Sequence, residues 1–241
     1  MNKIRQFFKS VPVYGWILGA GVITIQYIFY LFANWLSPII GTSAWAFCPK
    51  IPVIDDRIPF VPVFMLIYIY SYVFWVTGPI IASLTEKRNF INYLYMLLAT
   101  WVICFLLLLF LPTYIDREAE GVLEYAARPG ILNWMSRVIY TADGGRYGYN
   151  LFPSLHCISS MNCYLAIRRR PEISRDIRVY SAVMVVLIAL STVFTKQHYF
   201  MDVVSGLVIP VLCYIIVWKI DPGSRLMEKK KAGPEGPAGE P

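Results

Sequence analysis

The sequence predicts an all-α integral membrane protein with six transmembrane helices. Hydrophobic residues make up 57% of the 241 residues and charged residues only 15%, and the mean hydropathy is +0.54. The charged residues are gathered in short stretches, and long windows without Asp, Glu, Lys or Arg lie between them. A soluble helical bundle would instead carry charged residues along one face of each helix. Composition and charge pattern therefore favour a membrane bundle.

Six charge-free windows are the candidate membrane spans. They cover residues 10–49, 58–85, 89–115, 147–167, 179–195 and 203–218. A spanning helix needs about 20 mostly apolar residues, so the last two windows are somewhat short. Lys196, His198 and Asp202 separate these two windows, which predicts a tight turn at one membrane face.

The distribution of basic residues predicts the orientation of the bundle. If the N-terminus is cytoplasmic, the inner connections hold 15 of the 22 Lys and Arg residues. The positive-inside rule then places both termini in the cytoplasm of a multi-pass cell-membrane protein. We expect a six-helix transmembrane domain over residues 1–220 and a flexible cytoplasmic tail over residues 221–241. Because topology explains the net charge of +7, no nucleic-acid partner is expected.

The longest predicted connection covers residues 112–152 on the outer side and leads into the segment LFPSLHCISS. Pro153 ends this connection, and Ser154 is placed to act as the N-cap of the next helix. The free backbone N–H groups at such a helix start can bind an anion. We therefore expect an anion site near Ser154.

The chain contains only two histidines, His156 and His198, and both are flanked by apolar sequence. Ionisable groups at membrane depth are costly, so they are functional candidates. Asp202 follows His198 by one helical turn, from where its carboxylate can orient the imidazole. The predicted topology brings both histidines and Arg128 to the outer face. Neither histidine has a second His or Cys ligand at the usual zinc spacing, so no metal or cofactor is expected.

Three segments together resemble the signature motifs of the type 2 phosphatidic acid phosphatase superfamily. PSLH at residues 153–156 resembles PSGH, S-T-x5-H-x3-D at residues 191–202 resembles SR-x5-H-x3-D, and Arg128-Pro129 resembles the end of K-x6-RP. The resemblance covers residues 121–206. It implies the six-helix bundle of that superfamily and an enzyme that acts on membrane lipid phosphates without a cofactor.

The resemblance also implies a role for each matching residue. His198 would attack phosphorus to give a phosphohistidine, and Asp202 would orient it. His156 would protonate the departing alkoxide and then activate water or an alcohol. Arg128, Ser154 and nearby backbone amides would hold the phosphoryl oxygens.

The sequence departs from the family motifs at three positions. Gly121 replaces the motif lysine, Leu155 replaces the glycine of PSGH, and Thr192 replaces the arginine of the third motif. PSLH and the missing arginine are more similar to the branch with inositol phosphorylceramide synthase and sphingomyelin synthase, which transfer phosphorylated head groups. The loss of two cations leaves open which group neutralises the phosphate.

Lys196 is the best candidate for a replacement cation because it lies two residues from His198, and Arg137 and Arg146 are alternatives. Lys196 can equally be a snorkelling side chain at the membrane rim, and Arg128 an interfacial anchor. Three functions stay open: a lipid phosphate phosphatase, which we favour, a head-group phosphotransferase, and a non-catalytic lipid transporter or scaffold. The lipid head group, the acceptor and the oligomeric state are not predicted.

Overall fold

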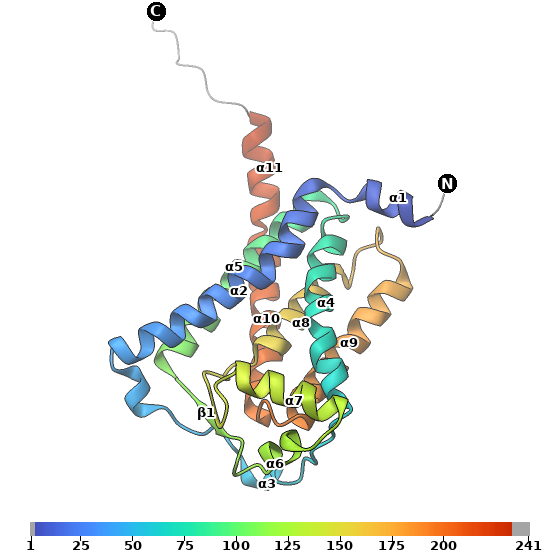
Figure 1. Cartoon of the computed structure of the whole chain (residues 1–241). Coiled ribbons are helices and arrows are strands. Elements are labelled where there is room, and N and C mark those ends of the chain that lie inside the picture. The colour runs from blue at the N-terminus through green and yellow to red at the C-terminus, as the bar shows by residue number, and fades with distance from the viewer. Residues whose placement is uncertain (1–2, 233–241) are drawn as a thin grey trace, which may run out of the picture.

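The computed structural model describes residues 3–232 and consists of helices around one short helix (Figure 1). Its long helices are α2 (Val13–Ile39), α4 (Phe64–Ala82), α5 (Lys87–Phe110), α9 (Arg175–Phe194) and α10 (Phe200–Ile220). The short helix α8 (Leu155–Ile167) packs against α4, α5, α9 and α10. Most side chains of α8 are buried, so it forms the centre of the bundle. The predicted all-α architecture is confirmed.

The remaining elements are small and join the long helices. They are α1 (Lys3–Ser10), the 3₁₀ helix η1 (Thr42–Trp45), α3 (Pro52–Asp55), α6 (Val122–Ala127), α7 (Ile131–Ala142), α11 (Pro222–Ala232) and the strands β1 (Tyr114–Asp116) and β2 (Tyr147–Tyr149). The two strands form an antiparallel pair in which Ile115 lies opposite Gly148.

The structure does not confirm the predicted count of six spans. Within residues 3–232, five helical segments are long and apolar enough to cross a membrane, and α8 is not among them. Its 13 residues give a length of roughly 20 Å at about 1.5 Å per residue, below the roughly 30 Å of a bilayer core. The charge-free window at residues 147–167 was misleading because its first third forms β2 and the loop to Pro153 rather than helix.

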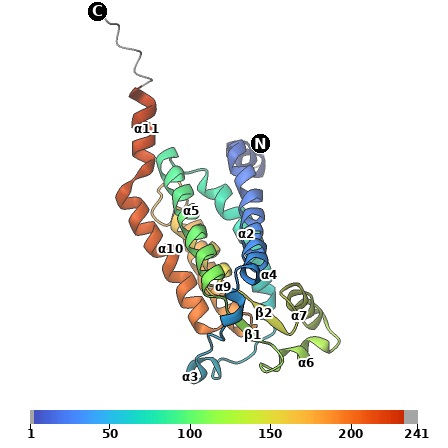
Figure 2. The ribbon, with the colours of Figure 1, turned by 90° about the vertical axis from the view of Figure 1, so that its left-hand side faces the viewer.

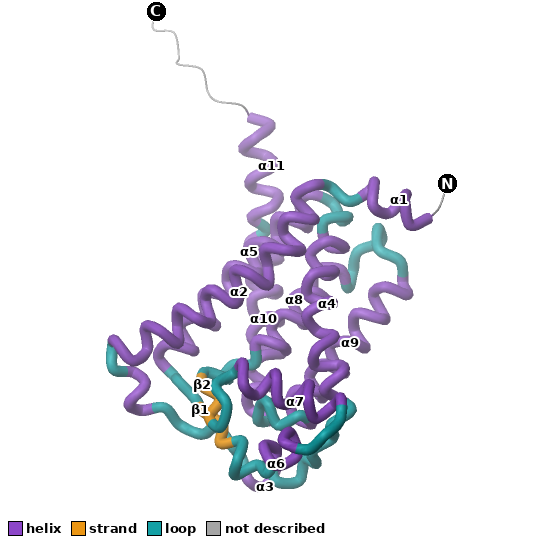
Figure 3. Tube along the Cα trace, in the orientation of Figure 1, coloured by secondary structure: helices purple, strands orange, loops and turns teal. Residues whose placement is uncertain are grey.

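The two ends of the bundle differ in structure. α1 and α11 lie at one end, whereas α3, α6, α7 and the strand pair cover the other (Figures 1 and 2). Most of the irregular backbone is at this second end (Figure 3). The long connection between α5 and α8, residues 111–154, therefore folds over the end where α9 turns into α10. We call this connection the structured cover.

Helices α2 and α4 contact closely at one end and diverge toward the covered end (Figure 1). Two glycines of α2 make the close contact possible. A Cβ atom on Gly15 would lie 2.2 Å from the Oγ atom of Ser83, and one on Gly19 would lie 2.7 Å from Ile80. Small residues at such crossings allow helices to approach closely in a membrane. Helices α2 and α4 thus form a V, which is narrow at Gly15 and Gly19 and open toward the structured cover (Figure 1).

The predicted tail begins as helix. α10 ends at Ile220, and the chain then continues into α11. Asp221 forms an ion pair with Arg88 of α5, and the backbone N–H of Gly223 donates a hydrogen bond to Asn92 at 2.8 Å. These contacts attach the start of α11 to the bundle. Residues 233–241 of the predicted tail lie outside the described residues.

Candidate active site

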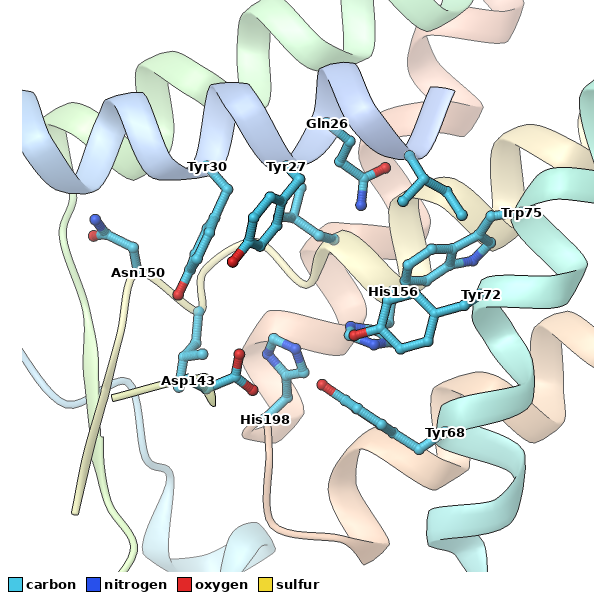
Figure 4. Close-up of a pocket in the computed structure, with 13 residues that line it drawn as sticks. Gln26, Tyr27, Tyr30, Tyr68, Tyr72, Trp75, Asp143, Asn150, His156 and His198 are labelled. Carbon is cyan, nitrogen blue, oxygen red and sulfur yellow. The ribbon is translucent and has the colours of Figure 1, made fainter. Parts of the chain in front are cut away.

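A cavity of about 100 Å³ lies between the open side of the V and the structured cover (Figure 4). It receives side chains from α2, α4 and α8, from the connection around β2, and from the turn after α9. The lining residues are Ile23, Gln26, Tyr27, Tyr30, Tyr68, Tyr72, Trp75, Asp143, Asn150, Leu151, Leu155, His156 and His198. Both histidines of the chain therefore face one cavity.

His156 occupies the first turn of α8. The helix starts where the sequence predicts, because the Oγ atom of Ser154 accepts a hydrogen bond from the backbone N–H of Cys157. The imidazole stacks on the ring of Tyr68, with ring centroids 4.1 Å apart, and meets Trp75 at 4.7 Å. Its Nε2 atom is buried without a hydrogen-bond partner among the described residues. Aromatic packing, rather than a polar partner, thus fixes this ring.

His198 lies on a short turn, residues 195–199, that joins α9 to α10 and that we call the His198 turn. The backbone N–H groups of Gln197 and His198 both donate to the carbonyl oxygen of Thr192, at 2.9 and 3.1 Å. The hydroxyl of Tyr140 on α7 donates to the carbonyl oxygen of Thr195 at 2.8 Å. The turn is therefore held at its start by α9 and by the structured cover.

Asp202 fixes the orientation of His198. Its Oδ2 atom lies 3.4 Å from Nδ1 of His198 and accepts a hydrogen bond from the backbone N–H of Tyr199 at 2.9 Å. The carboxylate is fully buried and closes the first turn of α10. Because Nδ1 faces Asp202, Nε2 remains as the nitrogen that can react.

The two imidazoles have the spacing of a cooperating pair. Their ring centroids are 5.9 Å apart and their planes cross at 61°. A phosphorus atom between the rings can lie about 3 Å from a nucleophilic nitrogen while its leaving oxygen lies within hydrogen-bond reach of the other ring. The pair can therefore provide a nucleophile and an acid–base group for one phosphoryl group.

The predicted phosphate ligands do not line the cavity. Ser154 is buried as the helix cap. Lys196 is also buried, but its Nζ atom donates to the carbonyl oxygen of Asp55 at 3.0 Å and pairs with Glu120 at 3.4 Å. Arg128 is exposed and forms an ion pair with Glu124 at 2.7 Å. The structure therefore brings the histidines and Asp202 together and leaves Arg128 on the surface.

The alternative cations are also outside the cavity. Arg146 forms ion pairs with Asp116 at 3.3 Å and Glu118 at 2.6 Å, and its side chain is half exposed. Arg137 lies on an exposed position of α7 and lines a separate hollow on the cover.

Arg117 is a cation that the sequence analysis missed. It is fully buried, and its guanidinium donates to the carbonyl oxygen of Gly145 at 2.8 Å and to the Oε1 atom of Gln197 at 2.9 Å. It thus ties the cover to the residue before His198. Burial lowers the pKa of Arg117, but its carbonyl and amide acceptors compensate part of the desolvation cost. An arginine between Asp116 and Glu118 is typical of an exposed loop, so nothing in the sequence indicated that Arg117 is buried.

Asp55 is a second missed residue. Its buried carboxylate accepts two hydrogen bonds, one from the backbone N–H of Phe200 at 2.8 Å and one from that of Ile51 at 2.6 Å. It therefore caps the start of α10 from the end of α3, 145 residues away in sequence. A buried acceptor at a helix N-terminus satisfies free donors and matches the helix dipole.

Asp143 places a carboxylate in the cavity next to the histidines (Figure 4). Burial raises its pKa, while Arg117 and His198 act in the opposite direction. Its Oδ2 atom is 3.8 Å from the Arg117 guanidinium. The cavity thus contains one carboxylate and, among its described lining residues, no Lys or Arg. Among the described residues no group of three His, Cys, Asp or Glu side chains is arranged to hold a metal ion.

The fold and the site define a multi-pass helical membrane protein with an oriented histidine pair under a structured cover. A family model described as the PAP2 superfamily matches residues 52–216. The chain belongs to this superfamily, that of the type 2 phosphatidic acid phosphatases, as the sequence motifs indicate. Comparisons with curated proteins and with solved structures gave no match. Membership supports phosphatase or phosphotransferase activity in general terms.

Proposed function

We propose that the protein is an integral membrane lipid phosphate phosphatase that works through a phosphohistidine. The observation that carries this proposal is the pair of imidazoles in one cavity, whose ring centroids are 5.9 Å apart. The buried carboxylate of Asp202 orients one of them, His198. Membership of the PAP2 superfamily supports the reaction class. The apolar helices that line the cavity favour a substrate that resides in the bilayer.

The proposed reaction has two displacement steps. In the first, Nε2 of His198 forms a bond to phosphorus, the bond to the lipid oxygen breaks, and His156 in its protonated form gives its proton to that oxygen. Asp202 stabilises the positive charge that develops on the attacking ring. In the second step water attacks the phosphohistidine, His156 accepts its proton, and inorganic phosphate leaves as the His198 ring is restored.

Release of inorganic phosphate from phosphatidic acid in detergent micelles tests the proposal. The wild-type protein is expected to release phosphate, and His198→Ala is expected to reduce the rate to background at an unchanged melting temperature. Brief incubation with ³²P-labelled substrate should label the wild type through an acid-labile bond and leave His198→Ala unlabelled. Equal conversion by both proteins would refute the role of His198. Identical lipid profiles in cells with either protein would instead favour the transporter or scaffold.

A head-group phosphotransferase is the second candidate, and the composition of the cavity favours it. A phosphomonoester is largely a dianion at neutral pH, yet no Lys or Arg lines the cavity among the described residues. Asp143, Asn150 and Gln26 provide polar groups that can bind the hydroxyls of an acceptor alcohol. In this reaction the alcohol replaces water in the second step. Formation of a new phosphodiester on addition of a polyol, without phosphate release in its absence, would identify transfer.

We also propose that α8, although shorter than the bilayer core, is the sixth crossing because the longer helices packed around it shield it from lipid. In this arrangement both termini are cytoplasmic and the site faces the extracytoplasmic side. The bundle supports this arrangement because α1 and α11 lie at the same end (Figure 1), whereas the cavity is lined by residues of the connection around β2 and by His198 of the turn after α9, which lie toward the other end. Labelling of single cysteines by a membrane-impermeant maleimide in intact cells tests it, in a background where the five native cysteines are replaced. Residue 130 is expected to react from outside and residue 172 only after lysis.

A further inference from the structure

The cavity presents a problem for any phosphoryl-transfer reaction, because developing negative charge needs hydrogen-bond donors or cations. The nearby cations are engaged elsewhere. Lys196 contacts Glu120 and a backbone carbonyl, Arg117 contacts Gly145 and Gln197, and Arg128 is on the surface. Neutral donors of the cavity wall are therefore the available ligands for phosphoryl oxygens.

Tyr68 is the donor whose placement is most specific. Its side chain is only 2% exposed, and its ring stacks on His156 at 4.1 Å. Figure 4 shows its hydroxyl pointing toward His198. This hydroxyl has no hydrogen-bond partner among the described residues, whereas the hydroxyl of Tyr30, which lines the same cavity, donates to the carbonyl oxygen of Tyr149.

The ring of Tyr68 is buried, but its hydroxyl oxygen is not one of the fully enclosed polar atoms among the described residues, so this oxygen opens onto the cavity. A phenylalanine would provide the same stacking surface, so packing on His156 does not explain the hydroxyl. The position of the oxygen beside both imidazoles does provide an explanation, since a phosphoryl group between the rings would lie next to it. Tyr27 and Tyr72 also line the cavity, but they are 58% and 38% exposed, whereas Tyr68 is almost fully buried and stacks on His156.

We infer that Tyr68 is a catalytic residue whose hydroxyl donates a hydrogen bond to a phosphoryl oxygen, in place of the motif cations replaced by Gly121 and Thr192. The inference rests on the proposed phosphoryl transfer and holds for water or an alcohol as acceptor. The stack on His156 holds the phenol ring in place, so little reorganisation is needed when charge develops on the oxygen. Removal of one such donor typically lowers kcat by about 10²–10³-fold.

The test compares Tyr68→Phe with Tyr70→Phe on the same helix. Tyr70 is 43% exposed and its hydroxyl bonds to that of Tyr180 at 2.8 Å, away from the cavity. With phosphatidic acid in detergent micelles, Tyr68→Phe is expected to lower kcat about 100-fold with KM changed less than threefold. Inhibition by vanadate, a mimic of five-coordinate phosphorus, should weaken in parallel. Tyr70→Phe should leave kcat, KM and vanadate inhibition unchanged.

Tyr68→Leu, which removes hydroxyl and ring together, separates the hydroxyl from the stack. If Tyr68→Phe keeps wild-type kcat and vanadate inhibition while Tyr68→Leu loses activity, the ring alone matters and the inference is overturned. Equal melting temperatures of wild type and Tyr68→Phe are expected because the ring is retained. A wild-type protein without His198-dependent turnover would instead refute the proposed function, so the two failures are distinguishable.

Discussion

The cap that Asp55 provides for α10 gives a prediction whose size follows from the structure. Asp55→Ala removes the acceptor of two backbone N–H groups, those of Ile51 and Phe200. Each buried donor left without a partner costs about 1–3 kcal/mol, so the loss is about 2–6 kcal/mol. At about 2–4 °C per kcal/mol, the melting temperature should fall by about 4–24 °C. Activity should fall as well, because Phe200 directly follows the His198 turn.

The neighbouring residue provides a matched control. The side chain of Asp56 is 57% exposed and pairs with Lys50 at 2.7 Å, and exposed pairs of this kind contribute about 0–1 kcal/mol. Melting of Asp55→Ala and Asp56→Ala in the same detergent, followed by tryptophan fluorescence, compares the two. Asp55→Asn keeps one carbonyl acceptor and should fall between wild type and Asp55→Ala. Equal melting temperatures for Asp55→Ala and Asp56→Ala would show that the cap has no energetic role.

Three further predictions concern the rest of the site. Gly206→Ala places a methyl group 2.7 Å from the carbonyl oxygen of Ser154. This overpacking should lower the free energy of unfolding by about 1–3 kcal/mol, which thermal melting measures. Gly21→Ala is the control, because its methyl group meets nothing within 4 Å and should not destabilise the protein. Burial raises the pKa of Asp143 in the folded protein, so the carboxyl group ionises at a lower pH in the unfolded chain than in the folded one. The stability of the wild type should therefore fall as pH rises from the unfolded pKa to the folded pKa. The melting temperature of Asp143→Asn relative to wild type should therefore rise across that pH window, and a pH-independent difference would contradict the assignment. Asp202→Asn keeps an acceptor but loses the charge, so kcat should fall about 10²–10⁴-fold with little change in KM, and near-normal turnover would argue against charge stabilisation.

The sequence alone predicts the membrane bundle and the centre of the site. His156, His198 and Asp202 are recognisable because ionisable residues are rare in apolar sequence and because their spacing matches known motifs. The cap at Ser154 follows from local helix chemistry in the same way. The His198–Asp202 pair and the Ser154 cap depend on residues close in sequence, where spacing determines geometry, whereas the meeting of His156 with His198 follows from the predicted topology.

The surroundings of the site were not predictable in this way. Asp55, Arg117 and Tyr68 act through contacts across the fold, and nothing in their local sequence distinguishes them from surface or core residues. The length of α8 was overestimated because an apolar window does not reveal how much of it is helix. Arg128 matches a motif position, yet the backbone that follows Gly121 directs it to solvent beside Glu124.

The V formed by α2 and α4 affects how the lipid substrate of the proposed reaction would reach the histidines. Because one side of the cavity wall is built from two adjacent helices that are long and apolar enough to cross a membrane, a lipid substrate would be able to approach sideways from its own leaflet. Moving an acyl chain into water costs about 0.8 kcal/mol per methylene group, a cost that lateral entry avoids. Only the head group would then have to leave the lipid phase, and chain length should have little influence on turnover.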